Sequence, residues 1–133
     1  MKRKWKWQPR GKNQCGQVAV AVIAGISLEE SIAVVGKRGC TRTKDLVRAL
    51  RLMGYECPDR CKKMPRPKLG LGQVRDSTKR SGWHWVVVDG DKIFDGAFGE
   101  RDGTVTWPID PNGLRWRITS YLPITECSRG SNG

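Results

Sequence analysis

Three residues carry the chemistry that this sequence could perform: Cys15, His84 and Asp95. Cys15 stands between a polar loop and a run of small apolar residues in GKNQCGQVAVAVIAG, where a helix N-terminus would favour the thiolate. His84 is the only histidine of the chain. An imidazolium beside a thiol stabilises the thiolate, and a carboxylate that accepts the ring N–H orients the imidazole. Together these residue types predict a nucleophilic thiol that attacks a carbonyl carbon.

Each of the three residues also has a structural interpretation. A cysteine at the start of a helix can be inert, a histidine in a strand can be a core or surface residue, and Asp95 can cap a turn. Attack on a carbonyl also creates an oxyanion, which needs N–H donors already in place. The backbone N–H of Cys15 and one side-chain amide from the preceding loop could supply them. The candidate amides are Gln8, Asn13 and Gln14, with Gln8 preferred.

A predicted β-hairpin connects the histidine to the aspartate. The segment VVVDGDKIFDG contains Asp-Gly, which is strongly favoured in two-residue turns. If Asp89 and Gly90 form the turn, His84 lies directly opposite Asp95, on the same face of the sheet. Strand alternation then turns Trp85 to the other face, where we expect it to be part of the core.

The elements that must position Cys15 are predicted to be helices. Residues 15–24 alternate like a strand in VAVAV, but their length, their alanines and the entry through NQCG favour a buried helix that ends at Gly25. Ser27 and Glu30 have the spacing of a capping box, which begins a second helix that ends at Gly36.

A third helix and a sheet complete the predicted fold. In TRTKDLVRALRLMGY the apolar residues have helical spacing, with Thr43 as the expected N-cap and Gly54 as the stop. Residues 56–82 are rich in proline, glycine and charge and predict loops around one short strand. Several strands separated by glycine turns follow. The order predicts a single α+β domain with N-terminal helices packed on an antiparallel sheet. Its expected parts are a basic arm (1–14), a helical part (15–54), loops (55–82), a β-sheet (83–124) and a flexible tail (125–133).

The charge is distributed unevenly along the chain. The formal net charge is +12, and residues 1–80 hold 20 Lys and Arg against 6 Asp and Glu. This asymmetry predicts an acidic partner, either a protein or nucleic acid, although high charge can also serve solubility alone. The basic residues expected to contact such a partner are Lys2, Arg3, Lys4, Lys6, Arg10 and Lys12.

The five cysteines are an odd number, which fits reduced thiols in a cytoplasm better than a disulfide framework. Cys57 and Cys61 are spaced like zinc ligands, but no second close pair accompanies them, so no metal or cofactor is expected. No apolar run approaches a membrane span, and the basic start lacks the apolar segment of a signal peptide. The sequence therefore predicts a cytoplasmic protein without a membrane partner.

The stretches NQCGQVAVAVIAG, ISLEESIAVVG, GCTRTKDLVRALRLMGY and HWVVVDGDKIFDG together resemble the papain-like cysteine peptidases of the bacteriocin-processing, double-glycine (C39) type, over residues 8–96. The resemblance implies a papain-like fold and a stand-alone relative. It implies Cys15 as nucleophile, His84 as general base and acid, and Asp95 as the orienting residue. The family usually places its oxyanion glutamine six residues before the nucleophile, whereas Gln8 lies seven before Cys15.

The expected function is cysteine-dependent hydrolysis of a peptide or isopeptide bond in a peptide or protein substrate, after glycine as the resemblance implies. Two alternatives stay open. In one, the scaffold is catalytically inactive and its basic surface binds an acidic protein or nucleic acid. In the other, a Cys-His enzyme of this kind hydrolyses amide bonds of the cell wall.

Overall fold

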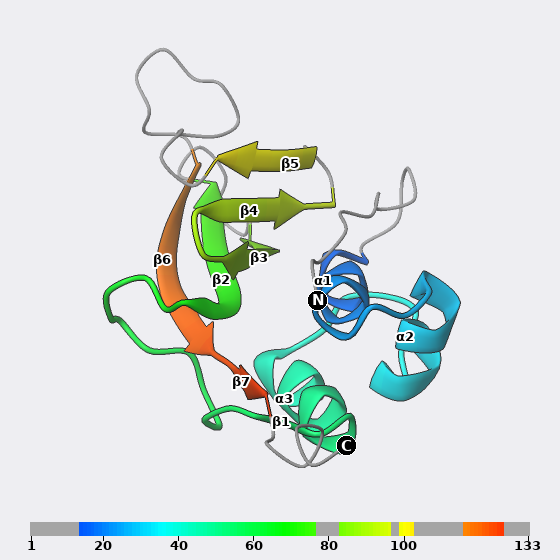
Figure 1. The fold of residues 1–133 in the computed structure, drawn as a ribbon. Helices are drawn as coiled ribbons and strands as arrows, with labels where there is room; N and C mark the ends of the chain where they lie inside the picture. Colours follow the sequence, from blue (N-terminus) through cyan, green and yellow to red (C-terminus); the bar gives the residue numbers. More distant parts are fainter. Residues whose placement is uncertain (1–13, 77–82, 97–98, 103–115, 127–133) are drawn as a thin grey trace.

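The computed structural model describes residues 14–76, 83–96, 99–102 and 116–126. Within these ranges the chain is an α+β fold, in which three helices lie beside antiparallel strands (Figure 1). The elements in chain order are α1 (Cys15–Ala24), α2 (Leu28–Val35), α3 (Thr43–Leu52), β1 (Tyr55–Glu56), β2 (Leu69–Asp76), β3 (Trp83–Asp89), β4 (Lys92–Asp95), β5 (Gly99–Asp102), β6 (Trp116–Pro123) and β7 (Thr125–Glu126).

The first helix, α1, is surrounded by the rest of the protein. Every residue from Gly16 to Ile23 is buried, which explains why its sequence is apolar on all sides instead of on one stripe. The helix ends at Gly25, whose φ of 69° lies in the left-handed region that favours glycine. The prediction of a helix over residues 15–24, in preference to a strand, is therefore confirmed.

The second and third helices begin with side chains that satisfy free backbone N–H groups. At the start of α2, Ser27 and Glu30 form the predicted capping box. The N-cap of α3 is Arg42, so the prediction of Thr43 was wrong by one residue. The reason is Asp45, whose carboxylate accepts the Arg42 backbone N–H at 2.8 Å and so draws Arg42 into the cap position.

The main sheet has five antiparallel strands in the order β5-β4-β3-β2-β6. The one strand expected within residues 56–82 is β2, which is eight residues long and lies inside the sheet, between β3 and β6. Two-residue strands also form where only loop and tail were expected, since β1 pairs with β7. The helix α1 contacts β3, β4 and both other helices, as the ribbon in Figure 1 also shows.

Apolar side chains form two clusters. The larger joins the helices to one set of strand residues, and Trp85 belongs to it, as predicted. The smaller contains the strand residues that alternate with these, including Val74, Val86 and Ile93. The sheet therefore carries buried apolar side chains on both of its faces.

The hairpin between β3 and β4 has a different register from the predicted one. Asp89 pairs with Lys92, so the turn residues are Gly90 and Asp91. Gly90 has a φ of 60° and occupies the first turn position, where a type II′ turn requires glycine. The prediction that placed Asp89 and Gly90 in the turn, and His84 directly opposite Asp95, was therefore wrong. The shift amounts to two residues, however, and a shift of two keeps every side chain on its original face.

No single helix among the described residues is both long and apolar enough to cross a membrane, although α1 and α2, which meet at a bend of 109°, would pass together on length and composition.

Candidate functional site

The histidine and the aspartate form a buried pair. His84 lies on β3 and Asp95 ends β4, and the Nε2 atom of His84 is 2.7 Å from Oδ1 of Asp95. Asp95 is fully buried and His84 is only 9% exposed. Continuing the observed register places Asp95 opposite Val86, two residues along β3 from His84, a diagonal distance that a carboxylate and an imidazole can bridge.

The cysteine reaches the same histidine. Cys15 is the first residue of α1, and its side chain lies close enough to His84 to raise the pKa of the imidazole. Because Asp95 occupies Nε2, the nitrogen left to face the sulfur is Nδ1. The structure thus brings together Cys15, His84 and Asp95, the three residues that the sequence singled out.

The charge of His84 follows from its surroundings. Burial alone would lower its pKa, because a charged ring is poorly solvated inside the protein. The hydrogen bonds and negative charges of Asp95 and Cys15 outweigh burial and raise the pKa of His84 from 6.5 to about 10. At neutral pH the ring is therefore an imidazolium, held between a carboxylate and the cysteine sulfur. This is the electrostatic arrangement that a thiolate nucleophile needs.

Of the three candidate oxyanion amides, the structure describes only Gln14. Gln8 and Asn13 lie outside the described residues. The buried side chain of Gln14 donates from Nε2 to the carbonyl oxygen of Arg38 at 2.8 Å, so this amide is directed at the loop between α2 and α3.

Gly16 and Gln17, which follow Cys15 directly, fix the position of the helix that carries it, and neither was predicted from the sequence. Gln17 is fully buried, and its Nε2 donates to the carbonyl oxygens of Lys37 and Gly39 at 2.9 and 2.8 Å. Gly16 lies so close to Thr41 that a Cβ atom at position 16 would collide with the Thr41 hydroxyl. The available signal was a glutamine inside an otherwise apolar helix, since a buried amide needs specific partners.

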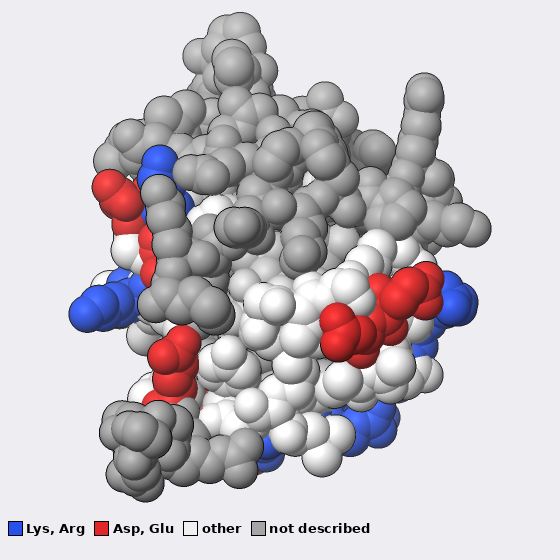
Figure 2. Space-filling model, turned by 45° about the vertical axis from the view of Figure 1, so that its right-hand side comes forward, with Lys and Arg blue, Asp and Glu red and all other residues white. Residues whose placement is uncertain are grey.

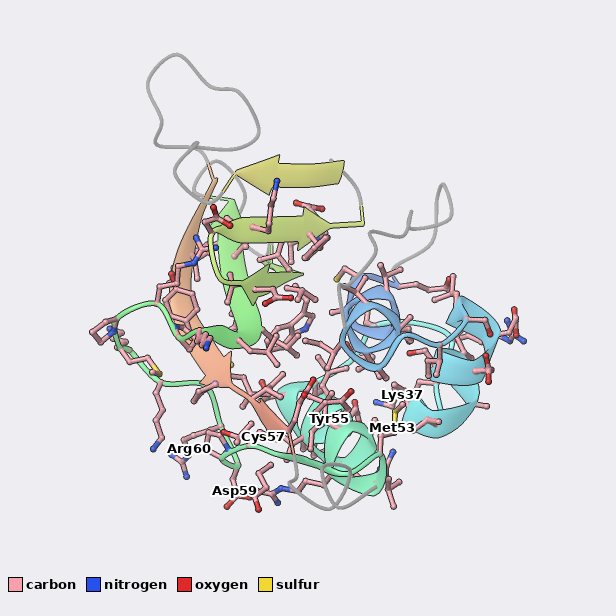
Figure 3. All side chains as sticks on the ribbon, in the orientation of Figure 1. Lys37, Met53, Tyr55, Cys57, Asp59 and Arg60 are labelled. Carbon is pink, nitrogen blue, oxygen red and sulfur yellow. The ribbon has the colours of Figure 1, made fainter. Side chains whose placement is uncertain are left out.

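The remaining cysteines do not form a metal centre within the described residues, which contain no group of three or more His, Cys, Asp or Glu side chains placed to hold an ion. Burial raises the pKa of both Cys57 and Cys61, which opposes formation of their thiolates. Figure 3 shows Asp59 and Arg60 at the outer edge of the loop between these cysteines, with Asp59 paired to Arg51 at 2.9 Å.

The basic residues predicted to contact an acidic partner, from Lys2 to Lys12, lie outside the described residues. Figure 2 shows acidic and basic side chains next to one another at the left and right edges of this face, with mostly uncharged residues between the two edges.

Comparison of the chain with protein-family models and with curated proteins finds no match. The geometry of the Cys15, His84 and Asp95 side chains is therefore the basis on which a function can be argued.

Proposed function

We propose that the protein is a papain-like cysteine hydrolase that cleaves a peptide or isopeptide bond with Cys15, His84 and Asp95. The observation that carries this proposal is the 2.7 Å contact between His84 and Asp95 beside Cys15, in which both partners raise the pKa of the buried imidazole to about 10. A histidine with a purely structural role does not need both a carboxylate and a thiol as partners. Strongly perturbed groups of this kind are concentrated at functional sites.

In the proposed reaction the Cys15 thiolate attacks the amide carbonyl carbon and forms a carbon–sulfur bond, while the carbonyl electron pair moves to oxygen. The oxyanion receives hydrogen bonds from the Cys15 backbone N–H and from an amide side chain, for which Gln8 is the candidate. The intermediate collapses, the carbon–nitrogen bond breaks, and the leaving amine takes its proton from His84. A thioester remains on Cys15.

The second half of the reaction restores the enzyme. Neutral His84 takes a proton from a water molecule, whose oxygen attacks the thioester carbon. The carbon–sulfur bond breaks and the carboxylic acid product leaves. Cys15 is again a thiolate beside the His84 imidazolium. Throughout, Asp95 holds the ring orientation through the 2.7 Å contact to Nε2.

The family that we infer is the papain-like C39 type, and its support is the order of the elements. The cysteine begins a helix, the histidine lies on the third strand, and the aspartate ends the fourth. Cleavage after glycine and a stand-alone, cytoplasmic role belong to this proposal through the resemblance.

One observation favours a second candidate function, a binding protein on the same scaffold. The first 80 residues carry 20 Lys and Arg against 6 Asp and Glu, which suits an acidic protein or nucleic acid. Under this alternative, neutralising the basic residues between Lys2 and Lys12 abolishes function, and Cys15 is dispensable.

The two candidates are separated by Cys15→Ala, with Cys40→Ala as the matched control because Cys40 is an exposed free cysteine. We expect hydrolysis of a glycine-containing peptide library, followed by mass spectrometry, to disappear in Cys15→Ala and to be unchanged in Cys40→Ala. Cleavage that survives in folded Cys15→Ala protein would refute the hydrolase proposal.

A further inference from the structure

A polar cavity of about 570 Å³ lies between the helical part and the sheet. It is lined by Thr43, the first residue of α3, by Cys61, and by residues of β2 and β6. The exposed cations Lys63 and Arg75 also line it. The volume lies in the range of sites that bind small molecules or short peptide segments and is large for a bare ion.

A β-bulge directs an additional hydroxyl group into this cavity. The pairing of β2 with β6 shifts between Gln73 and Val74. Gln73 pairs with Ser120 and Val74 pairs with Ile118, so Thr119 lies opposite no residue of β2. In a regular strand, neighbouring side chains point to opposite faces. Here the side chains of both Thr119 and Ser120 line the cavity. Bulges commonly redirect a side chain beside a functional site.

The hydroxyl groups in the cavity are held weakly. Thr119 Oγ1 donates to the backbone oxygen of Gln73, and Ser120 Oγ donates to its side-chain oxygen, both at 3.2 Å. A typical O–H···O hydrogen bond is shorter, about 2.7–2.8 Å. The hydroxyls of Ser120 and Thr43 are also hydrogen-bonded to the Cys61 thiol, which lines the same cavity. A carboxylate, which is a stronger acceptor than a thiol, can compete for these donors.

The charged side chains that line the cavity favour an anionic ligand. Among the described residues that line it, Lys63 and Arg75 are cationic and none is acidic. Cations combined with hydroxyl donors form charge-assisted hydrogen bonds to a carboxylate, and these are stronger than bonds between neutral groups.

The cavity lies between the same two parts of the molecule that supply the candidate catalytic residues. On the helical side, Thr43 is two residues from Thr41, which touches the position next to Cys15. On the sheet side, Gln73 and Arg75 flank Val74, which pairs with His84, so by strand alternation their side chains point to the opposite face from His84. The cavity therefore lies on the sheet face that carries Trp85, and a peptide must extend from Cys15 along the helix-facing side of the sheet to reach it.

We propose that this cavity binds the carboxylate of an acidic residue in the peptide substrate, so that the protein selects acidic peptides. The inference rests on the proposed function for the identity of the ligand. Its chemistry rests on Lys63, Arg75 and the hydroxyls of the bulge.

The test uses full-length Cys15→Ala protein, so that bound peptide is not cleaved. Two fluorescein-labelled peptides, Gly-Glu-Gly-Glu-Gly-Glu-Gly-Gly and its counterpart with glutamine in place of glutamate, are titrated by fluorescence polarisation. We expect the glutamate peptide to bind about tenfold more tightly, and Arg75→Gln and Lys63→Gln each to remove about tenfold of that affinity. The matched controls are Arg60→Gln and Lys44→Gln, which remove the same charge from exposed positions outside the cavity and should change the affinity less than twofold.

Equal binding of the two peptides, or equal losses in the Lys44→Gln and Lys63→Gln proteins, would overturn the site, since the preference would then be absent or due to net charge alone. Arg75 lies within a strand, so Lys63→Gln, in the loop before the sheet, keeps the test valid if Arg75→Gln fails to fold. Selective binding by Cys15→Ala protein, with no cleavage by the unaltered protein, would refute the hydrolase proposal and leave the acidic-peptide site standing.

Discussion

Replacing Gly16 with alanine tests how the nucleophile is positioned. A Cβ atom built at residue 16 collides with Thr41 Oγ1 and comes within 3.1 Å of Leu46 Cδ2 and 3.2 Å of Thr41 Cβ. The alanine favours the helix by up to about 1 kcal/mol relative to glycine. Forcing a methyl group into a packed interior costs about 1–3 kcal/mol. Because several close contacts must be relieved at once, we expect the steric effect to win.

The expected net result is a loss of about 1 kcal/mol in the free energy of unfolding, measured by urea denaturation. Thr41→Ala removes the colliding hydroxyl, so the double variant should recover much of this loss, as a thermodynamic cycle would show. The matched control is Gly39→Ala, where a Cβ meets nothing within 4 Å. It should be neutral or slightly stabilising, because alanine restricts the unfolded chain. Unchanged or increased stability of Gly16→Ala would refute the close contact beside Cys15.

Three further predictions concern charged groups. Asp95→Asn should lower kcat by about 10²- to 10⁴-fold, while circular dichroism shows an intact fold, because the imidazole loses its orienting carboxylate; a normal kcat in the variant would exclude Asp95 from the mechanism. The pKa of His84, about 10, should set the alkaline limit of kcat/KM, since the imidazolium persists until pH rises through that value, and a limit near pH 6.5 would contradict the raised pKa. The backbone N–H of Arg42 and the Lys37 ammonium lower the pKa of Asp45, so its contribution to stability is present above pH 3.8 and is lost as pH falls through the lowered pKa. Urea denaturation of Asp45→Asn should show a smaller loss of stability on acidification than the unaltered protein, and equal losses would argue against this ion pair.

Local patterns were sufficient for the helical part of the fold. The capping box of Ser27 and Glu30 and the left-handed glycines Gly25 and Gly36 mark helix ends through backbone hydrogen bonding alone, which the sequence specifies directly. The sheet was harder, because β2 contains two glycines in LGLGQV and has a weak strand pattern. Its position between two neighbouring strands stabilises it, and that information is not local.

The candidate site, too, was predictable where local patterns specify it and unpredictable where distant segments meet. Cys15, His84 and Asp95 were found from residue type and hairpin alternation, and the two-residue error in register did not separate them, because it preserved the faces. The roles of Gln17 and Gly16 could not be predicted, since their partners come from the 37–41 loop. The bulge beside Thr119 depends on a mismatch between β2 and β6 and leaves no local pattern.

The contact between Cys15 and His84 is tested most directly by thiol alkylation. Iodoacetamide at pH 6, with peptide mass spectrometry, gives the rates for Cys15 and for the exposed Cys40 in the same protein. We predict that Cys15 reacts faster than Cys40, and that His84→Ala removes the difference, because the imidazolium sustains the thiolate. Equal rates for the two cysteines, or a fast Cys15 that is insensitive to His84→Ala, would contradict the account.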